Sequence, residues 1–285
     1  MRTIGQGKET YLYLNGISTS NEILLHRNAV LMPVTAEFQY KKVSDLLNND
    51  IDFAVAAVSG RTIASQLHLT AENGKELAVL AWNASWDCLL LGAIFHCEVF
   101  DNLQCDKPIE NLEKSSYINV TNYAFRAILT EPYMITQNDE AWIIKNYSSA
   151  YELLDTEPFV TAVHAMATYK WHSMPRVQLA ILWSGIEALF DANTEISFRI
   201  SLYIANYLSN SDLSAAEEIY LKTKKLYASR SAAVHGGKMK GDLNEIVSAS
   251  AKLLNRIIRR CAELGKIPDT SKLVFPSSYD GITEQ

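Results

Sequence analysis

The sequence has few features that would cross-link the chain, direct its export or anchor it in a membrane. Its four cysteines form no C-x-x-C pair, which excludes the usual zinc spacing and favours reduced thiols. The longest apolar run, Cys88 to Phe95, has eight residues, whereas a membrane-spanning helix needs about 20. The first 14 residues also lack the apolar stretch of a signal peptide. These absences predict a cytoplasmic protein that does not span a membrane.

Phosphate-binding glycine loops, internal repeats and low-complexity tracts are also missing, although the chain contains 12 glycines. Neither His96 beside Cys97 nor His164 with His172 has the spacing of metal ligands. We therefore expect neither a metal ion nor another cofactor. With 48% hydrophobic and 20% charged residues, the 285-residue chain is expected to fold into one large or two modest globular domains.

The charge of the chain is unevenly distributed. The formal net charge is −6, which by itself argues against a nucleic-acid-binding protein. From Lys222 to Lys266, however, eleven basic and three acidic residues give a net charge of +8, and the rest of the chain carries −14. A basic region on an acidic chain suits a polyanion such as RNA. For Arg256, Arg259 and Arg260 in this region, an ordinary solvated helix face is an equal alternative.

Residues 1–140 have the composition of a mixed α/β module whose role the sequence does not reveal. The segments Tyr11–Leu14, Val30–Tyr40 and Tyr117–Phe125 are rich in the aromatic and β-branched side chains typical of strands. Pro33 indicates an edge strand or a bulge at the start of the second segment. The apolar segment Glu76–Phe100 fits either a buried strand pair or a buried helix, which periodicity does not distinguish. We therefore expect a sheet with a covering helix.

From about Asn138 the pattern becomes helical, which predicts an antiparallel bundle over residues 141–266 and a mobile tail over 267–285. The expected helices cover 141–154, 159–171, 176–191, 196–208, 213–231 and 242–264. The predicted fold class is therefore α+β, with a strand-containing first part followed by an all-α bundle. The change in composition places the domain boundary between residues 135 and 155.

One of these helices ends in an arrangement that suggests a site. Arg230 and His235 are separated by four residues and are followed by Gly236 and Gly237. On a continuous helix, five positions amount to about 500°, so these two side chains would not share a face. Glycine supports the left-handed backbone that ends helices. We therefore expect the helix to end between Arg230 and His235, which would bring a guanidinium and an imidazole into one open groove.

The segments around this pair resemble a known family. The run from Arg230 to His235 matches the R-x4–6-H motif of HEPN domains, helical bundles many of which are metal-independent ribonucleases. Leu182–Phe190, Phe198-Arg199 and Leu226–Gly236 are similar, in this order, to the Apea-like branch of that family. The resemblance covers roughly residues 155–265. It implies a HEPN-type bundle that handles RNA without a cofactor and forms a two-fold homodimer in which the two motifs face each other.

The residue types of the motif suit cleavage of RNA without a metal ion. A histidine titrates near working pH and can take the proton from a ribose 2′-hydroxyl, whose oxygen then attacks the adjacent phosphorus. An arginine places parallel donors on the phosphoryl oxygens as negative charge develops there. We predict His235 as general base or acid and Arg230 as the cation that stabilises the transition state. The alternative is an arginine that caps helix carbonyls and a histidine that packs in a turn.

Two neighbours of the motif are expected to support it. Ser231 would either donate to a phosphate or bond only to the preceding turn, and we weigh these equally. Glu187 has apolar neighbours, and a buried carboxylate needs a partner. As the resemblance implies, we expect Glu187 to orient Arg230. A structural pair between Glu187 and Arg199 is the alternative.

Four more residues are candidates for RNA binding. Lys238 and Lys240 would bind flanking phosphates as point charges, and Arg199 is a further candidate cation. Tyr227, one turn before the motif arginine, offers a ring on which a base could stack, although a place in the core is the favoured alternative.

Three functions fit the sequence. The first is a metal-independent endoribonuclease, and the resemblance places such enzymes in bacterial phage defence or stress responses, where the first part of the chain would sense a trigger. The second is a non-catalytic HEPN module that binds RNA or nucleotide, or that dimerises for a partner. A third is a toxin whose histidine-bearing loop is silenced by a modifying enzyme. The sequence does not name a regulatory partner.

Overall fold

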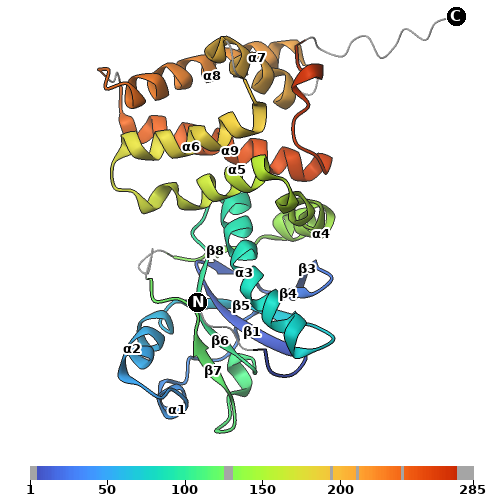
Figure 1. Cartoon of the computed structure of the whole chain (residues 1–285), viewed down its shortest axis with the longest axis vertical. Coiled ribbons are helices and arrows are strands. Elements are labelled where there is room, and N and C mark those ends of the chain that lie inside the picture. Colours follow the sequence, from blue (N-terminus) through green and yellow to red (C-terminus); the bar gives the residue numbers. More distant parts are fainter. Residues whose placement is uncertain (1–4, 125–130, 193–194, 210–211, 239–240, 275–285) are drawn as a thin grey trace, which may run out of the picture. The chain divides into compact units, whose positions relative to one another are not determined.

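The computed structural model describes residues 5–124, 131–192, 195–209, 212–238 and 241–274. The chain divides into two compact units, Met1–Tyr151 and Glu152–Gln285. Among the described residues, all strands lie in the first unit and the second is built from helices, which confirms the predicted α+β class (Figure 1). The division falls within the predicted interval. It leaves nearly all of α4 (Gln137–Glu152) in the first unit, whereas we predict the bundle to begin at residue 141.

A six-stranded antiparallel sheet forms the centre of the first unit, with the strand order β3-β4-β5-β1-β6-β7. These strands are β1 (Glu9–Asn15), β3 (Ile23–His26), β4 (Ala29–Pro33), β5 (Ile63–Thr70), β6 (Phe100–Cys105) and β7 (Ile118–Val120). Leu12 in β1 lies opposite Leu67 on one side and Gln104 on the other. A separate parallel pair joins β2 (Ile17–Ser18) to β8 (Tyr133–Met134).

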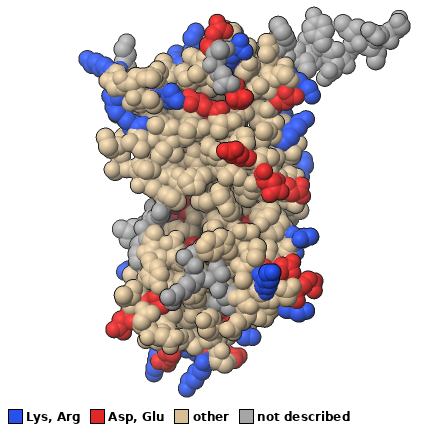
Figure 2. All heavy atoms as spheres, viewed as in Figure 1, with Lys and Arg blue, Asp and Glu red and all other residues tan. Residues whose placement is uncertain are grey.

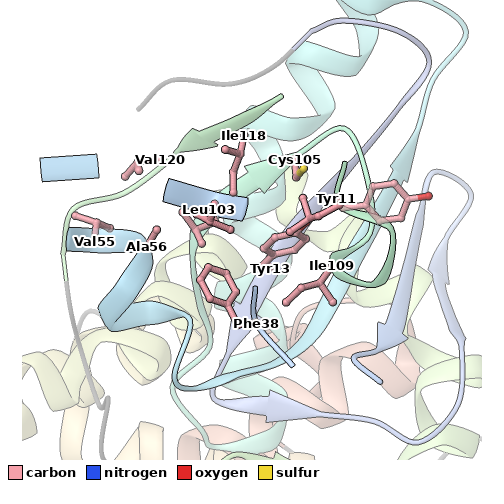
Figure 3. Packing of buried hydrophobic residues seen from close by; sticks show 12 residues of the cluster. Tyr11, Tyr13, Phe38, Val55, Ala56, Leu103, Cys105, Ile109, Ile118 and Val120 are labelled. Atoms are coloured by element: carbon pink, nitrogen blue, oxygen red, sulfur yellow. The ribbon is translucent and has the colours of Figure 1, made fainter. Parts of the chain in front are cut away.

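Two short helices, α1 (Tyr40–Leu46) and α2 (Asp50–Ser59), pack with the sheet around a buried apolar cluster. Figure 3 shows Phe38 next to Tyr13 and Leu103 of the sheet, with Val55 and Ala56 of α2 to one side of them. The hydroxyl of Tyr13 donates to the carbonyl of Lys107 at 2.8 Å, so its polar end is satisfied inside this core. The cluster fixes the first unit as a folded body of its own.

The segment that fits either a strand pair or a helix is a helix, α3 (Gly74–Phe95). By length and composition it could cross a membrane, but 56% of its most apolar window is buried, as in a core helix. The absence of a membrane segment therefore stays a prediction. Tyr147 of α4 donates to the Asp87 carboxylate of α3 at 2.9 Å, and Tyr151 stacks on His26 of the sheet. These contacts hold α4 in the first unit.

The prediction of one strand from Val30 to Tyr40 is wrong beyond Pro33. The strand β4 ends at Pro33, whose ring nitrogen carries no hydrogen for a further ladder bond. The amide of Thr35 then donates to Glu110 at 2.8 Å, away from the sheet. The expected strand over 117–125 is also shorter, because β7 covers only three residues.

Five α-helices make up the described part of the second unit. They are α5 (Glu157–Thr168), α6 (Pro175–Phe190), α7 (Ile196–Leu208), α8 (Leu213–Val234) and α9 (Leu243–Leu264), with short 3-10 turns at Leu153–Asp155, Tyr169–Trp171 and Thr270–Lys272. Asn206 donates to the carbonyl of Leu273 at 2.7 Å. The first residues of the predicted mobile tail are therefore bonded to α7, which corrects that prediction up to residue 274. Residues 275–285 lie outside the described residues.

Helix α6 is central to the second unit because it packs against α5, α8 and α9. A side chain at Gly185 would place a Cβ 2.8 Å from the Cβ of Ala165 and 3.3 Å from Leu254. The absent side chain therefore allows three helices to approach one another closely. Two residues on either side of Gly185, the same packing fixes the positions of Trp183 and Glu187. Trp183 bonds to Ser250 of α9, and Glu187 bonds to Arg230 of α8.

Candidate functional site

The C-terminal end of α8 is the place that the sequence motif selects. Asp212 caps the start of α8 by accepting the amide hydrogens of Ser214 and Ala215. At the other end the helix continues to Val234, and Gly236 follows with a φ of +72°. The amide of Gly237 donates to the carbonyl of Ala232 at 2.8 Å, which is the bond of a Schellman motif. The glycines therefore end the helix at Val234, and His235 is its C-cap residue.

The helix therefore ends between Arg230 and His235, as predicted, but so close to His235 that the two side chains do not converge. Because the backbone stays helical up to the cap, the two side chains project about 140° apart around the axis. The His235 side chain is exposed and makes no hydrogen bond to a residue that the structure describes. The Arg230 side chain is only 19% exposed and is turned toward α6. One chain alone does not bring the guanidinium and the imidazole into a common groove.

The expected partner of Arg230 is confirmed. Its Nη2 donates to Oε2 of Glu187 at 2.7 Å, across the contact between α8 and α6. The alternative pair of Glu187 with Arg199 is not formed. The Arg199 side chain is 43% exposed, and its Nε lies 3.9 Å from Oε2 of Glu195 on the same helix. Glu187 therefore holds the motif arginine in one orientation.

The hydrogen bonding of this ion pair is incomplete. Oε1 of Glu187 and Nε of Arg230 are buried and have no hydrogen-bond partner among the described residues. Burial raises the pKa of Glu187, while the Arg230 guanidinium acts in the opposite direction and favours the carboxylate. Buried polar atoms are almost always paired. The two unpaired atoms mark a position where a further polar group would be stabilising.

Tyr227 belongs to the core, so the prediction that it stacks on a base is wrong and the alternative is confirmed. Its side chain is 8% exposed. The ring meets Trp183 edge to face at 5.2 Å between centroids, and the Arg230 guanidinium lies 5.6 Å from the ring centre. Trp183 in turn donates to Ser250 of α9 at 3.2 Å. Neither face of the tyrosine is left for a base, and burial raises its pKa.

Arg176 is a functional candidate that the sequence does not reveal. It stands in the first turn of α6 and donates from Nη1 to the carbonyls of Ala232 and Ala233, at 3.1 and 3.3 Å. Its Nη2 donates to the carbonyl of Gly237 at 2.9 Å. One guanidinium thus binds the end of α8 on both sides of His235, where the helix dipole favours a cation. No local pattern predicts this contact, because its acceptors are backbone atoms more than 50 positions away.

Replacing Arg176 with alanine should lower the free energy of unfolding by about 2 kcal/mol, since three charge-assisted hydrogen bonds to helix-end carbonyls are lost. Urea unfolding would measure the change. Arg176→Lys should recover only part of it, because an ammonium group cannot reach acceptors on both sides of the turn as the planar fork does. Equal stability of Arg176→Ala and the unchanged protein would show that the turn does not depend on this contact.

The remaining predicted residues lie around the same turn. Ser231 is half-buried, and its carbonyl accepts the amide hydrogen of His235 at 3.0 Å. Lys238 is exposed, and Lys240 lies outside the described residues. Figure 2 shows Lys and Arg side chains gathered on this face at the end of the bundle where α8 gives way to α9. The end of α8 is thus basic, as its sequence predicts.

An apolar rim adjoins the exposed imidazole. Val234, next to His235, is 46% exposed, and Met174, two residues before Arg176, is 60% exposed. The hydrogen bonds from Arg176 place these segments at one end of the bundle. Large apolar side chains exposed close together are typical of a surface that another molecule covers.

Within the part of the chain that the structure describes, no group of three or more His, Cys, Asp and Glu residues could hold a metal ion. Comparisons with family models, with curated proteins and with solved structures find no match to this chain. The family resemblance of residues 155–265 therefore stays a prediction, and the function has to be argued from the geometry of the site.

Proposed function

We propose that the helical unit is a HEPN-type module that binds RNA at the end of α8 and cleaves it as a metal-independent endoribonuclease. The observation that carries the proposal is the state of Arg230. Glu187 fixes its orientation through one bond of 2.7 Å. That bond is its only hydrogen bond to a described residue, although a guanidinium has five donors. A held cation with unused donors is suited to bind a phosphate.

The chemistry requires only side chains that the unit supplies. The imidazole of His235 takes the proton from a ribose 2′-hydroxyl, and the 2′-oxygen forms a bond to the adjacent phosphorus. The bond from phosphorus to the 5′-oxygen breaks. The imidazolium formed at His235 then returns a proton to that leaving oxygen. Arg230 stabilises the negative charge on the phosphoryl oxygens. The products are a 2′,3′-cyclic phosphate and a 5′-hydroxyl, with no net consumption of protons.

The geometry of one chain leads us to propose that the working site forms between two copies. Because α8 separates Arg230 from His235 by about 140°, a guanidinium of one copy would face the imidazole of the other. A second copy would also cover the exposed apolar side chains of Val234 and Met174. Buried polar atoms of the Arg230–Glu187 pair would gain partners from RNA or from that copy.

A second candidate function is a non-catalytic HEPN module that binds RNA or nucleotide, or that dimerises for a partner. One observation favours it. Arg230 is already neutralised by Glu187, and its side chain is mostly buried, so the pair would also serve as a structural link between α6 and α8. A role in phage defence or stress would follow from the family resemblance alone for either candidate.

Incubation of the purified protein with RNA in the presence of a chelator tests the proposal. We expect cleavage that resists the chelator and yields cyclic phosphate and 5′-hydroxyl ends. Binding of RNA without cleavage would favour the non-catalytic module. A protein that neither binds nor cleaves RNA would contradict both candidates.

A further inference from the structure

A pocket of about 170 Å³ lies between α8 and α9, on a part of the bundle that the motif does not include. Its floor is mostly apolar, with Leu226 and Leu253 only 8% and 7% exposed and Ala249 beside them, and it includes the buried Thr223. Lys222, Lys252 and Arg256 line its mouth and are exposed. The pocket therefore combines an apolar interior with a positively charged rim.

The three cations of the rim are not neutralised by the protein. No acidic residue lines the pocket. Across the described residues, none of Lys222, Lys252 and Arg256 forms an ion pair or a side-chain hydrogen bond. Lys252 and Arg256 are one turn apart on α9, where like charges repel each other. A bound anion would relieve this repulsion, so the mouth is complementary to negative charge.

The volume of the pocket limits the size of the group that it can hold. Its volume is close to that of engineered apolar cavities of about 150 Å³ that hold a single aromatic ring. A pyrimidine has one ring and matches this volume, whereas a purine has two fused rings and would extend out of the mouth. Leu226 precedes Arg230 by four residues, which is about 6 Å along the helix axis. The pocket is thus about one helical turn from the proposed cleavage site.

We propose that this pocket is a subsite for one pyrimidine nucleotide of a single-stranded RNA. The base lies on the apolar floor formed by Leu226 and Leu253, and the flanking phosphates contact Lys222, Lys252 and Arg256. The inference rests on the proposed function, because it takes RNA as the polyanion that reaches the end of α8. It adds a preference for pyrimidines, which the motif itself does not provide.

The test uses oligonucleotides whose ribose 2′-oxygen is methylated, so that the full-length protein binds them without cleaving them. Fluorescence anisotropy would compare labelled oligouridine with labelled oligoadenosine. We expect oligouridine to bind about tenfold more tightly, as one well-placed base contributes. Ala249→Phe fills the pocket and should remove this preference while the affinity for oligoadenosine stays unchanged. Ala228→Phe, at an exposed position of α8 outside the pocket, is the matched control and should retain the preference.

Lys252→Ser is a second variant, which tests the pocket even if the Ala249→Phe protein does not fold. It should weaken both oligonucleotides and reduce the salt dependence of binding. Equal affinity for the two oligonucleotides, or an unchanged preference in a folded Ala249→Phe variant, would overturn the subsite. A peptide of glutamate and leucine could also displace oligouridine from the unchanged protein and fail to bind Ala249→Phe. That result would overturn the RNA subsite in favour of an acidic protein partner. Binding of these methylated oligonucleotides is measured separately from cleavage of ordinary RNA. If the protein cleaves RNA but binds both oligonucleotides equally, only the subsite is wrong. If it prefers oligouridine but does not cleave RNA, only the enzyme proposal is contradicted.

Discussion

Replacing His235 with alanine lowers the rate of RNA cleavage by at least about a hundredfold, because the group that moves the 2′-hydroxyl proton is lost. The melting temperature stays unchanged, since this side chain is exposed and has no hydrogen-bond partner among the residues that the structure describes. Single-turnover cleavage and thermal unfolding of the same preparation measure the two effects. The combination separates a chemical role from a role in folding.

The matched control for this variant is His164→Ala. His164 is an exposed histidine of α5 in the same unit, away from the end of α8 in sequence, and its ring only meets the edge of Trp171 at 6.3 Å between centroids. Cleavage by His164→Ala should equal that of the unchanged protein. Unchanged cleavage by His235→Ala would remove the imidazole from the mechanism.

Replacing Arg230 with alanine abolishes cleavage and also destabilises the bundle, by about 2 kcal/mol near neutral pH, because Glu187 keeps its buried position without a cation. The loss depends on pH. Burial already raises the pKa of Glu187, and Arg230 is the largest opposing influence, so the variant raises this pKa further. A carboxyl whose pKa is higher in the folded state contributes most below its unfolded pKa, and stability falls as pH rises through the folded pKa. The variant should therefore be closest to the unchanged protein at acidic pH, below the ordinary pKa of a glutamate, and weakest at pH values above the raised pKa of Glu187.

The double variant Arg230→Ala with Glu187→Gln distinguishes the two consequences. A neutral amide at residue 187 has no charge to leave unpaired, so the variant should regain most of the stability and lose the dependence on pH. Its cleavage should stay at the level of Arg230→Ala, since the cation for the phosphoryl oxygens is still missing. Recovery of cleavage along with stability would show that Arg230 acts only as a structural link. Urea unfolding at several pH values and cleavage at one pH are the measurements.

Several features of this site can be predicted from sequence because they depend on neighbouring residues or on one helix face. The glycine pair ends α8 because Gly236 takes a left-handed backbone that other residues avoid. Glu187 pairs with Arg230 because a carboxylate among apolar neighbours on α6 needs a cation, and the resemblance names which one. The bundle itself follows from the helical spacing of apolar residues between 141 and 264.

The features that sequence reasoning missed depend on distant backbone atoms or on a difference of a few residues. The Schellman bond from Gly237 to Ala232 keeps the helix intact as far as Val234, three residues beyond the predicted end at 231. This longer helix turns the imidazole of His235 away from Arg230. Arg176 binds carbonyls of α8, and backbone acceptors leave no mark in the side-chain pattern. Val30–Tyr40 has strand-like side chains throughout, yet Pro33 ends the ladder.

The central claim is that a cleavage site joins Arg230 of one copy to His235 of another. Mixing purified Arg230→Ala with His235→Ala tests it most directly, after exchange of subunits has been verified with differently labelled chains. A mixed pair keeps one complete site, so cleavage should rise well above that of either variant alone and reach a substantial fraction of the unchanged protein. If the exchanged mixture cleaves no better than its two components, the two residues do not act across copies and the proposed site is wrong.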